Sequence, residues 1–235
     1  MYSFDTRVRY SETDATGKLT LEAILDYFQD VSTFHSEDLG LGIEYLGEKH
    51  LAWVLTAWQI VVERYPMYCE QIQVGTFPYE FKGFMGNRNF VLTDKAGRNV
   101  AYANSIWTLM NLETGRPERL LPEMKERYEL EPKLDMEYAP RKIALPEHLE
   151  AQEPIEIKSW HLDTNHHVNN GQYLRIALEY LGENVQITQM RAEYKKSALL
   201  GDIMIPKTVI HENRYTAVLE NESGEVFAVI ECTVV

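Results

Sequence analysis

The densest group of polar side chains in the chain lies at residues 160–170, which read WHLDTNHHVNN. Within it, Asp163, Asn165 and His167 occupy every second position, so an extended backbone would place their side chains on one face. A carboxylate and an imidazole can transfer the protons needed to activate water, and an amide can donate a hydrogen bond to a carbonyl oxygen. The three residues together supply the parts needed to activate water and orient a carbonyl group, so they are candidate catalytic groups.

A helix is expected to begin directly after this group. Asn170 is a favourable N-cap residue, and Gly182 suits the end of a helix. Between them, apolar side chains recur at helical spacing: Tyr173, Ile176, Ala177 and Tyr180. The first turn of a helix leaves backbone N–H groups unpaired, so Asn170 and Gly171 are candidate supports for a developing oxyanion.

The same residue types also favour turns and helix caps, so a structural interpretation competes with the catalytic one. An internal repeat helps to separate the two. When Asp14 is aligned with Asp163, the first copy reads DATGKLT at 14–20 and makes the same connection without an amide or an imidazole. Because Asn165 and His167 occur in the second copy alone, they favour catalysis there. The shared aspartate leaves a structural role for Asp163 open.

Each copy shows the same order of patterns. A segment of alternating polar and apolar residues is followed by a helical segment and then by short strands separated by turn residues. The first helix is expected at Leu21–Phe34 with Thr20 as its N-cap. Hairpin turns are expected around Gly97 and Gly224. We predict an α+β fold, a tandem (double) hotdog in which two long helices are each wrapped by antiparallel sheet.

Proline marks the connection between the two copies. Six of the nine prolines lie at residues 113–154, a density that a β-sheet cannot accommodate. We therefore divide the chain into an N-terminal, non-catalytic hotdog at 1–112, a proline-rich linker at 113–154 and a C-terminal catalytic hotdog at 155–235. At most a short helix near Glu123–Tyr128 is expected in the linker.

Composition narrows the class of protein. The 36 acidic residues outnumber the 23 basic ones and give a net charge of -13, which argues against a nucleic-acid groove. The longest apolar stretch, Leu51–Val62, is too short to span a bilayer, and the N-terminal segment lacks a secretory signal pattern. Cys69 and Cys232 are the only cysteines, which fits a reducing cytoplasm.

No metal or other cofactor is expected. His161, His166 and His167 lie close together in the sequence, but two cysteines cannot build a cysteine-rich zinc site and no HExxH motif is present. The glycines match no phosphate-loop spacing, which argues against a nucleotide site.

The chain resembles the plant and bacterial acyl-acyl carrier protein (acyl-ACP) thioesterases along essentially its whole length. The most telling blocks are WVLTAWQIVVERYPMYCEQIQVGT at 53–76, SIWTLMN at 105–111, WHLDTNHHVNNGQYL at 160–174 and AEYKK at 192–196. The resemblance implies a tandem hotdog that hydrolyses the thioester between a fatty acyl chain and ACP. It places the family's catalytic Asp, Asn and His on Asp163, Asn165 and His167.

The chain departs from the family at one point. The plant enzymes carry a Glu-Cys pair directly after the segment that matches AEYKK, and Ser197 and Ala198 stand there instead. A cysteine nucleophile is therefore excluded, because neither Cys69 nor Cys232 falls at that position. Either Ser197 holds a water molecule or Glu193 takes the role of the missing glutamate, and the sequence does not decide between them.

Two routes to hydrolysis stay open at this level. Water attacks the thioester carbon while Asp163 and His167 transfer protons, or Asp163 attacks directly and the resulting anhydride is hydrolysed. In both routes the acyl chain is expected in an apolar tunnel walled largely by the N-terminal copy. Two other functions also stay open: an acyl-CoA thioesterase, and a hotdog protein that binds acyl chains without cleaving them.

The expected partner is ACP, which presents the acyl chain on a phosphopantetheine arm and is itself acidic, as the resemblance implies. Because this chain is acidic as well, docking needs a local basic patch. One group of basic residues lies in the catalytic half of the sequence: Arg191, Lys195, Lys196 and Lys207. A second group lies in the linker: Arg116, Arg119, Lys125 and Arg127. We favour the first group, because the arm must enter near the catalytic residues; a homodimer is compatible with the sequence but is not indicated by it.

Overall fold

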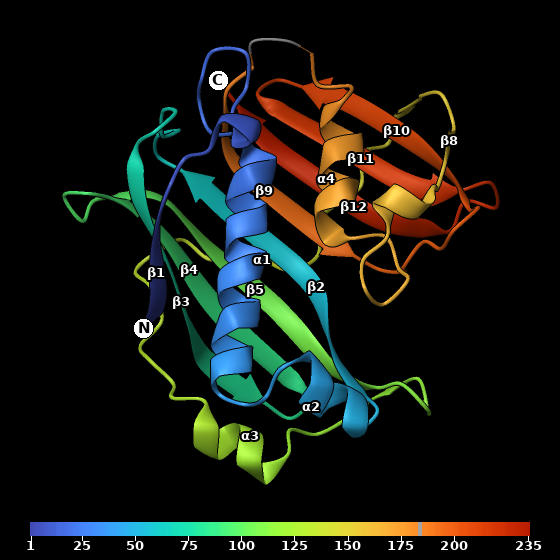
Figure 1. Cartoon of the computed structure of the whole chain (residues 1–235). Coiled ribbons are helices and arrows are strands. Elements are labelled where there is room, and N and C mark those ends of the chain that lie inside the picture. The colour runs from blue at the N-terminus through green and yellow to red at the C-terminus, as the bar shows by residue number, and fades with distance from the viewer. Residues whose placement is uncertain (183–184) are drawn as a thin grey trace. The chain divides into compact units, whose positions relative to one another are not determined.

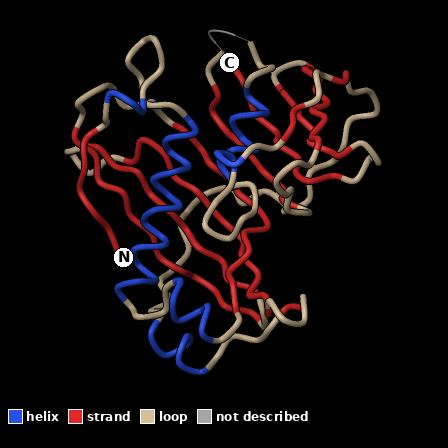
Figure 2. Tube along the Cα trace, turned by 45° about the vertical axis from the view of Figure 1, so that its right-hand side comes forward, coloured by secondary structure: helices blue, strands red, loops and turns tan. Residues whose placement is uncertain are grey.

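Each half of the chain folds into antiparallel sheet with one principal helix (Figure 1). The computed structural model describes residues 1–182 and 185–235. Strands make up most of both halves, and the helices lie against them (Figure 2). This arrangement confirms the predicted α+β class.

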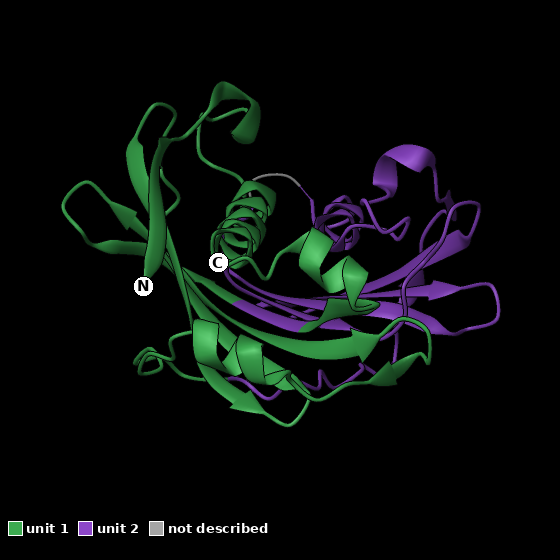
Figure 3. Ribbon diagram, turned by 60° about the horizontal axis from the view of Figure 1, so that its bottom comes forward, with its two compact units in different colours: residues 1–56, 60–138 green, residues 57–59, 139–235 purple. Residues whose placement is uncertain are grey.

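Residue contacts divide the chain into two units, which Figure 3 shows in different colours. Unit 1 comprises Met1–Thr56 and Ile60–Tyr138. Unit 2 comprises Ala57–Gln59 and Ala139–Val235. The main division therefore falls inside the proline-rich segment, between Tyr138 and Ala139.

Unit 1 is built on the strands β1 (Tyr2–Arg7), β2 (Leu51–Val62), β3 (Gln71–Lys82), β4 (Met85–Asp94), β5 (Asn99–Asn111) and β6 (Arg116–Pro117). Their order is β1-β3-β4-β5-β2, and β6 pairs with β5. Alternate residues point to opposite faces of a strand, so apolar residues at every second position produce one buried face. Val74 of β3 and Leu92 of β4 lie directly opposite each other, and both are fully buried.

The principal helix of unit 1 is α1 (Leu21–Asp38), which packs on the sheet at β3 (Figure 1). The Thr20 hydroxyl accepts a hydrogen bond from a backbone N–H of the first turn at 3.2 Å, so the predicted N-cap is confirmed. The buried ring of Phe28 packs on Phe90 of β4 with ring centroids 5.2 Å apart. The helix ends at Asp38, one turn later than the predicted Phe34.

Two short helices complete unit 1. These are α2 (Ile43–Glu48) and α3 (Pro122–Arg127). Proline begins α3, where its missing N–H removes no intrahelical hydrogen bond. The fully buried Met124 anchors α3 in an apolar cluster that includes Leu109. The short helix predicted near Glu123–Tyr128 is therefore confirmed.

Unit 2 is built on β7 (Glu150–Ala151), β8 (Ile155–Glu156), β9 (Ile187–Tyr194), β10 (Ile203–His211), β11 (Arg214–Asn221) and β12 (Val226–Val234). The order is β9-β12-β11-β10, and both β7 and β8 pair with β10. Ala217 of β11 and Ile230 of β12 lie opposite each other and are fully buried.

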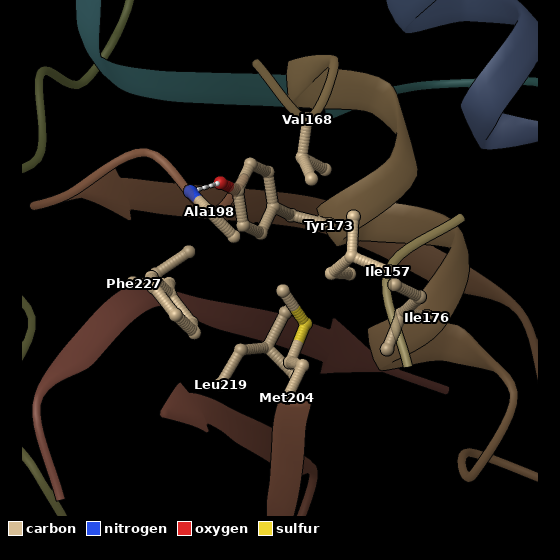
Figure 4. Packing of buried hydrophobic residues seen from close by; sticks show 9 residues of the cluster. Ile157, Val168, Tyr173, Ile176, Ala198, Met204, Leu219 and Phe227 are labelled. Atoms are coloured by element: carbon tan, nitrogen blue, oxygen red, sulfur yellow. Dashed lines mark hydrogen bonds between the residues drawn. The ribbon is translucent and has the colours of Figure 1, made fainter. Parts of the chain in front are cut away.

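The helix of unit 2 is α4 (Asn170–Leu178), which packs on one face of this sheet (Figure 4). Tyr173 and Ile176 from the helix contact an apolar cluster from the strands: Met204, Leu219, Phe227 and Ala228. The other face is covered by the segment after Ala139, where Ile143 packs on Val218 and Val229. Consecutive side chains along a strand of unit 2 therefore point alternately toward α4 and toward the segment after Ala139.

Two details of the predicted second helix are wrong. Its N-cap is Asn169, whose side-chain oxygen accepts the N–H of Gly171 at 2.8 Å, and Asn170 is the first helical residue. The helix ends at Leu178, before Gly182, which has left-handed backbone geometry with φ 89. The helix has 9 residues, against 18 in α1.

No helix within residues 1–182 and 185–235 is both long enough and apolar enough to cross a lipid bilayer. The longest described helix, α1, has 18 residues and carries acidic side chains along its length: Glu22, Asp26 and Asp30.

Candidate active site

Residues Asp163–His167 form a closed turn. The N–H of Asp163 donates to the C=O of His167 at 2.8 Å, and Leu162 and Val168 pair as an isolated bridge. Oδ1 of Asp163 accepts the backbone N–H groups of Asn165 at 2.8 Å and of His167 at 3.3 Å. The backbone of this segment is therefore not extended, because the carboxylate holds the chain in a turn. The turn nevertheless places Asp163 directly across from His167.

The first copy contains the same turn. The N–H of Asp14 donates to the C=O of Lys18 at 2.8 Å, and Asp14 Oδ1 accepts the N–H groups of Thr16 at 2.8 Å and Lys18 at 3.1 Å. Although partial burial acts to raise it, hydrogen bonds from Thr16 and Lys18 lower the pKa of Asp14 below its ordinary value. The aspartate thus has a structural role in both copies.

The two turns differ in what their side chains contact. In the first copy, the Thr16 hydroxyl donates to Asp14 Oδ1 at 2.7 Å. In the second copy, Asn165 and His167 are exposed, and neither side chain forms a hydrogen bond or ion pair within the described residues. The amide and the imidazole therefore have no local structural task and are accessible to a ligand. The same holds for Oδ2 of Asp163 in the described part of the chain.

Residues 14–18 and 163–167 thus share one five-residue frame, in which the side chain of the first residue accepts the N–H groups of the third and fifth. The same five-residue frame recurs in the hairpins that join β4 to β5 and β11 to β12. Asp94 Oδ1 accepts the N–H groups of Ala96 at 2.9 Å and Arg98 at 3.1 Å. Asn221 Oδ1 accepts the N–H groups of Ser223 at 3.1 Å and Glu225 at 2.9 Å. The side-chain oxygen of an asparagine thus supports the frame as well as a carboxylate does.

The fourth residue of the frame has left-handed backbone geometry. It is glycine in three of these turns, at Gly17, Gly97 and Gly224, with φ of 81, 76 and 79. The predicted hairpin turns at Gly97 and Gly224 are therefore confirmed. In the candidate catalytic turn at residues 163–167, the fourth residue is His166, with φ 60. A side chain in this region is strained relative to glycine, because its Cβ approaches the following carbonyl oxygen.

Substituting His166→Gly is expected to stabilise the protein. Relief of the left-handed strain outweighs the added backbone entropy of glycine, so the free energy of unfolding should rise by about 0.5 kcal/mol. Denaturant unfolding measures the change. The reverse substitution in the first copy, Gly17→His, should destabilise the protein by at least as much. A lower stability of the His166→Gly variant would contradict the assignment of strain.

The N-terminus of α4 offers fewer donors than the sequence indicates. The N–H of Gly171 is bound by the side chain of Asn169 at 2.8 Å, and the N–H of Gln172 by the C=O of Asn169 at 2.9 Å. Gly171 is therefore not free to bind an oxyanion. Within the described residues the N–H of Asn170 has no acceptor, so it stays a candidate donor.

The loop after β9 lies against the turn. The C=O of Ala198 accepts the N–H of Val168 at 3.1 Å, and the N–H of Ala198 donates to the Tyr173 hydroxyl at 2.8 Å (Figure 4). The exposed Ser197 is therefore brought to the turn that carries His167. Burial raises the pKa of Tyr173 to about 12, so its hydroxyl stays protonated. Sequence reasoning assigned Tyr173 only to a helix face and missed this link.

Glu193 lies on the other face of the sheet. Its neighbour Tyr194 packs on the α4 side, where the hydroxyl donates to the C=O of Asn170 at 3.2 Å. Successive side chains alternate along a strand, so Glu193 points away from α4. Its buried carboxylate accepts the N–H of Ile143 at 3.1 Å. The structure does not bring Glu193 together with Asp163.

The side chain of His161 is engaged in a local backbone contact. It is buried, and its Nδ1 accepts the N–H of Lys158 at 2.9 Å. Burial lowers the pKa of His161 below its ordinary value. Glu12 makes the corresponding contact in the first copy, where it accepts the N–H of Arg9 at 2.7 Å. His161 therefore caps a turn, whereas His166 is exposed.

The sequence matches two family models, one for each half of the chain. Residues 1–128 match the N-terminal domain of acyl-ACP thioesterases, and residues 146–231 match the C-terminal domain of the same proteins. The chain belongs to the acyl-ACP thioesterase family.

Curated relatives in this family are plant proteins. The palmitoyl-acyl carrier protein thioesterase of Gossypium hirsutum is 26% identical over 234 residues, covering 91% of this chain and 56% of that protein. The oleoyl-acyl carrier protein thioesterase 2 of Arabidopsis thaliana is 25% identical over 219 residues, covering 84% of this chain and 59% of that protein. The chain thus spans a little over half the length of these relatives.

Solved structures of the same family share the fold. An acyl-ACP thioesterase from Bacteroides thetaiotaomicron has a TM-score of 0.90 at 23% identity, covering 99% of this chain and 97% of that chain. The 12:0-ACP thioesterase from Umbellularia californica has a TM-score of 0.89 at 19% identity, covering 100% of this chain and 96% of that chain. The predicted tandem hotdog is confirmed.

The basic residues predicted to dock ACP on this thioesterase fold do not form one patch. Arg191 lies on the Glu193 face of β9, pairs with Glu231 at 2.8 Å and donates to backbone carbonyl groups. Lys207 pairs with Glu220 at 2.6 Å. Lys196 pairs with Glu225, and the exposed Lys195 forms no ion pair within the described residues. Only Lys195 and Lys196, in the loop near Ser197, stay candidates for docking.

In this family member, unit 1 contains an arginine–histidine contact that the sequence did not reveal. Nη1 of Arg88 lies 3.0 Å from Nδ1 of His35, and Arg88 is 8% exposed. Burial lowers the pKa of Arg88 to about 10, and burial together with the Arg88 charge lowers the pKa of His35 to about 4. Within the described residues no carboxylate forms an ion pair with Arg88. The layer between α1 and the sheet is therefore not uniformly apolar.

The two cysteines of this family member lie outside the turn. Cys69 is exposed, Cys232 is buried in β12, and neither forms a disulfide. The folded double variant Cys69→Ser, Cys232→Ser is expected to keep any thioester hydrolysis within about threefold of the parent, because neither thiol lies in the Asp163–His167 turn. Steady-state kinetics measure this. Complete loss of activity in the folded variant would restore a cysteine mechanism.

Proposed function

We propose that this chain is a thioesterase that hydrolyses fatty acyl-ACP to free fatty acid and ACP. The observation that carries the proposal is the contrast between two turns with one backbone frame. The Thr16 hydroxyl donates a hydrogen bond to Asp14. In the second copy, the Asn165 amide and the His167 imidazole form no hydrogen bond within the described residues, although they lie in the same turn as Asp163. Membership of the acyl-ACP thioesterase family supplies the reaction class.

The chemistry follows from which atoms are engaged. Oδ1 of Asp163 holds the turn, so Oδ2 is the oxygen left to act on a substrate. In the water route, water adds to the thioester carbon and its proton passes to His167 or to Oδ2 of Asp163. The C–S bond then breaks, and the departing sulfur takes that proton as a thiol. In the alternative route, Oδ2 attacks the carbon itself, the C–S bond breaks and the sulfur leaves as a thiolate. Water then hydrolyses the mixed anhydride, which releases the fatty acid, regenerates the Asp163 carboxylate and supplies the proton that converts the thiolate to the thiol.

Charge develops on the carbonyl oxygen in either route. The Asn165 amide can donate a hydrogen bond to that oxygen, and the Asn170 N–H at the start of α4 provides a second donor. Ser197 is the proposed holder of the attacking water, because its loop lies against the turn through the Ala198–Val168 hydrogen bond. Glu193 has no part in this proposal, since its carboxylate faces the other side of the sheet.

The N-terminal copy is proposed to be non-catalytic and to hold the acyl chain. Its turn carries Thr16 and Lys18 where the second copy carries Asn165 and His167, so it lacks both functional groups. We retain the proposed hotdog boundaries of 1–112 and 155–235. A cytoplasmic location is proposed as well, supported by two cysteines that form no disulfide.

A hydrolysis assay tests the function directly. Acyl-ACP substrates of different chain lengths are compared with the matching coenzyme A esters, and released thiol and free fatty acid are measured. We expect kcat/KM for the best acyl-ACP to exceed that for its coenzyme A ester by at least about tenfold. Equal values would favour an acyl-CoA thioesterase. Binding of acyl-ACP without any hydrolysis would favour an acyl-chain-binding protein.

Docking of the acidic carrier is proposed to depend on Lys195 and Lys196. Reversing both to glutamate should raise KM for acyl-ACP by about fivefold, because like charges repel across a docking surface. Hydrolysis of acyl-pantetheine, which needs no protein docking, should change little. Lys207→Glu is the matched control, because Lys207 lies opposite Val218, on the face of the sheet that Ile143 covers and not on the α4 side. Equal responses of both substrates to Lys195 and Lys196 reversal would contradict docking.

A further inference from the structure

Large apolar side chains are exposed around the candidate catalytic turn. Trp160 is 69% exposed, Leu199 48% and Leu200 62%. We call these three residues the apolar collar. Exposed apolar side chains gathered next to polar catalytic groups are typical of a ligand-binding surface.

Backbone hydrogen bonds connect the neighbours of the collar residues to Val168 and Asn169, directly after the turn. The N–H of Asn169, which follows the turn, donates to the C=O of His161, the residue after Trp160, at 2.9 Å. The N–H of Val168 donates to the C=O of Ala198, the residue before Leu199, at 3.1 Å. Trp160 is therefore next to a residue that is bonded to Asn169, and Leu199 is next to a residue that is bonded to Val168. Leu200 follows Leu199 in the same loop.

We propose that the apolar collar binds the pantetheine arm of the thioester substrate. This rests on the proposed function. When the thioester carbon lies at Asp163 and His167, its sulfur is covalently bonded to the arm, so the arm must leave across the surface that surrounds the turn. The arm carries methylene groups next to the sulfur and between its two amides, and a geminal dimethyl group beyond the second amide. Those apolar groups match the indole of Trp160 and the leucine side chains of the collar.

The first copy provides a natural control for the proposal. The N–H of Met67 is held by Glu70 at 3.0 Å, as the N–H of Leu199 is held by Asp202 at 2.9 Å, so the two loops are equivalent. This loop also exposes apolar side chains, including Tyr68, whose ring contacts Tyr10 edge-on with centroids 6.0 Å apart. Its turn carries no amide or imidazole, so these side chains border no reacting thioester.

The experiment compares two thioesters of the same fatty acid. One is the acyl-pantetheine, and the other is the S-ethyl thioester, which lacks the arm. For the exposed-site variants Trp160→Ala and Leu200→Ser, KM for acyl-pantetheine should rise by about tenfold at nearly constant kcat, because the lost contacts are formed in ground and transition states alike. Kinetic constants for the S-ethyl thioester should stay within about twofold of the parent. Trp160→Phe, which keeps an aromatic ring, should restore most of the loss.

Tyr10→Ala is the matched control, because Tyr10 is 81% exposed beside the equivalent turn. It should leave both substrates unchanged. Equal effects of Trp160→Ala on both thioesters, or no effect on either, would overturn the collar while hydrolysis by the parent enzyme still supported the proposed function. A changed oligomeric state in the Trp160→Ala variant, with both substrates affected alike, would instead assign the collar to contacts between copies of the chain. Absence of hydrolysis by the parent enzyme would reject the function itself.

Discussion

Replacing Asp163 with asparagine is expected to lower kcat for thioester hydrolysis by at least about a hundredfold, the usual contribution of an acid–base or nucleophilic group. The fold should survive, because Asn221 holds the same five-residue frame with its amide oxygen in the β11–β12 hairpin. The substitution thus removes the free carboxylate oxygen and keeps the turn. Steady-state kinetics and denaturant unfolding, measured on the same preparation, separate the two effects.

Asp14→Asn is the matched control. Asp14 holds the equivalent turn in the first copy, so any loss that comes from weakening such a turn should appear there as well. We expect its kcat to stay within about threefold of the parent, because the first copy lacks the amide and the imidazole. Equal losses from both substitutions would remove the assignment of catalysis to the second copy.

The second large effect is expected for His167→Ala. The imidazole makes no hydrogen bond or ion pair within the described residues, so its removal should leave stability almost unchanged. Loss of proton transfer should nevertheless reduce kcat by at least about a hundredfold. Imidazole added to the assay should restore part of the activity of the variant, since a free base can enter the exposed site.

Lys18→Ala tests the same position in the first copy and should change kcat by less than about threefold. A His167→Ala variant that lost stability in proportion to activity would show a structural role for the imidazole. Failure of imidazole to rescue an intact, inactive variant would argue that His167 positions the substrate and transfers no proton.

Much of the fold was predictable because local rules are visible in a sequence. A threonine before an apolar helical stripe marks the start of α1, and its side-chain oxygen caps the helix as expected. Turn-forming residues around Gly97 and Gly224 mark two hairpins, because glycine adopts left-handed geometry without strain. The internal repeat then extended these local predictions to the architecture of both halves.

The backbone shape of the candidate site was not predictable from the spacing of its residues. Alternation of Asp163, Asn165 and His167 suits an extended strand, yet a turn closed by an aspartate uses the same spacing. The sequences DATGK, DKAGR and NESGE share a turn-forming residue followed by a glycine three positions later. In the second copy this position holds His166, so the pattern that would have revealed the turn is hidden.

Predictions that depended on which face a side chain occupies were less successful. Arg191 and Glu193 are close in sequence to the candidate site, but they face the segment after Ala139 on the opposite side of the sheet. That segment is rich in proline and has no periodic pattern from which its position could be predicted. Only tertiary packing decides which residues of β9 approach the turn.

The four turns built on the five-residue frame differ in local stability. In three of the four turns a side chain within the frame donates back to the capping residue: Thr16 to Asp14, Arg98 to Asp94 and Ser223 to Asn221. In the described part of the chain, Asp163 receives no such bond, and each missing bond is worth about 1 kcal/mol. The left-handed backbone strain at His166 lowers the local stability of this turn further. Of the four turns, the one proposed to carry the chemistry therefore resists local opening least, and heating should abolish activity before it unfolds the sheets.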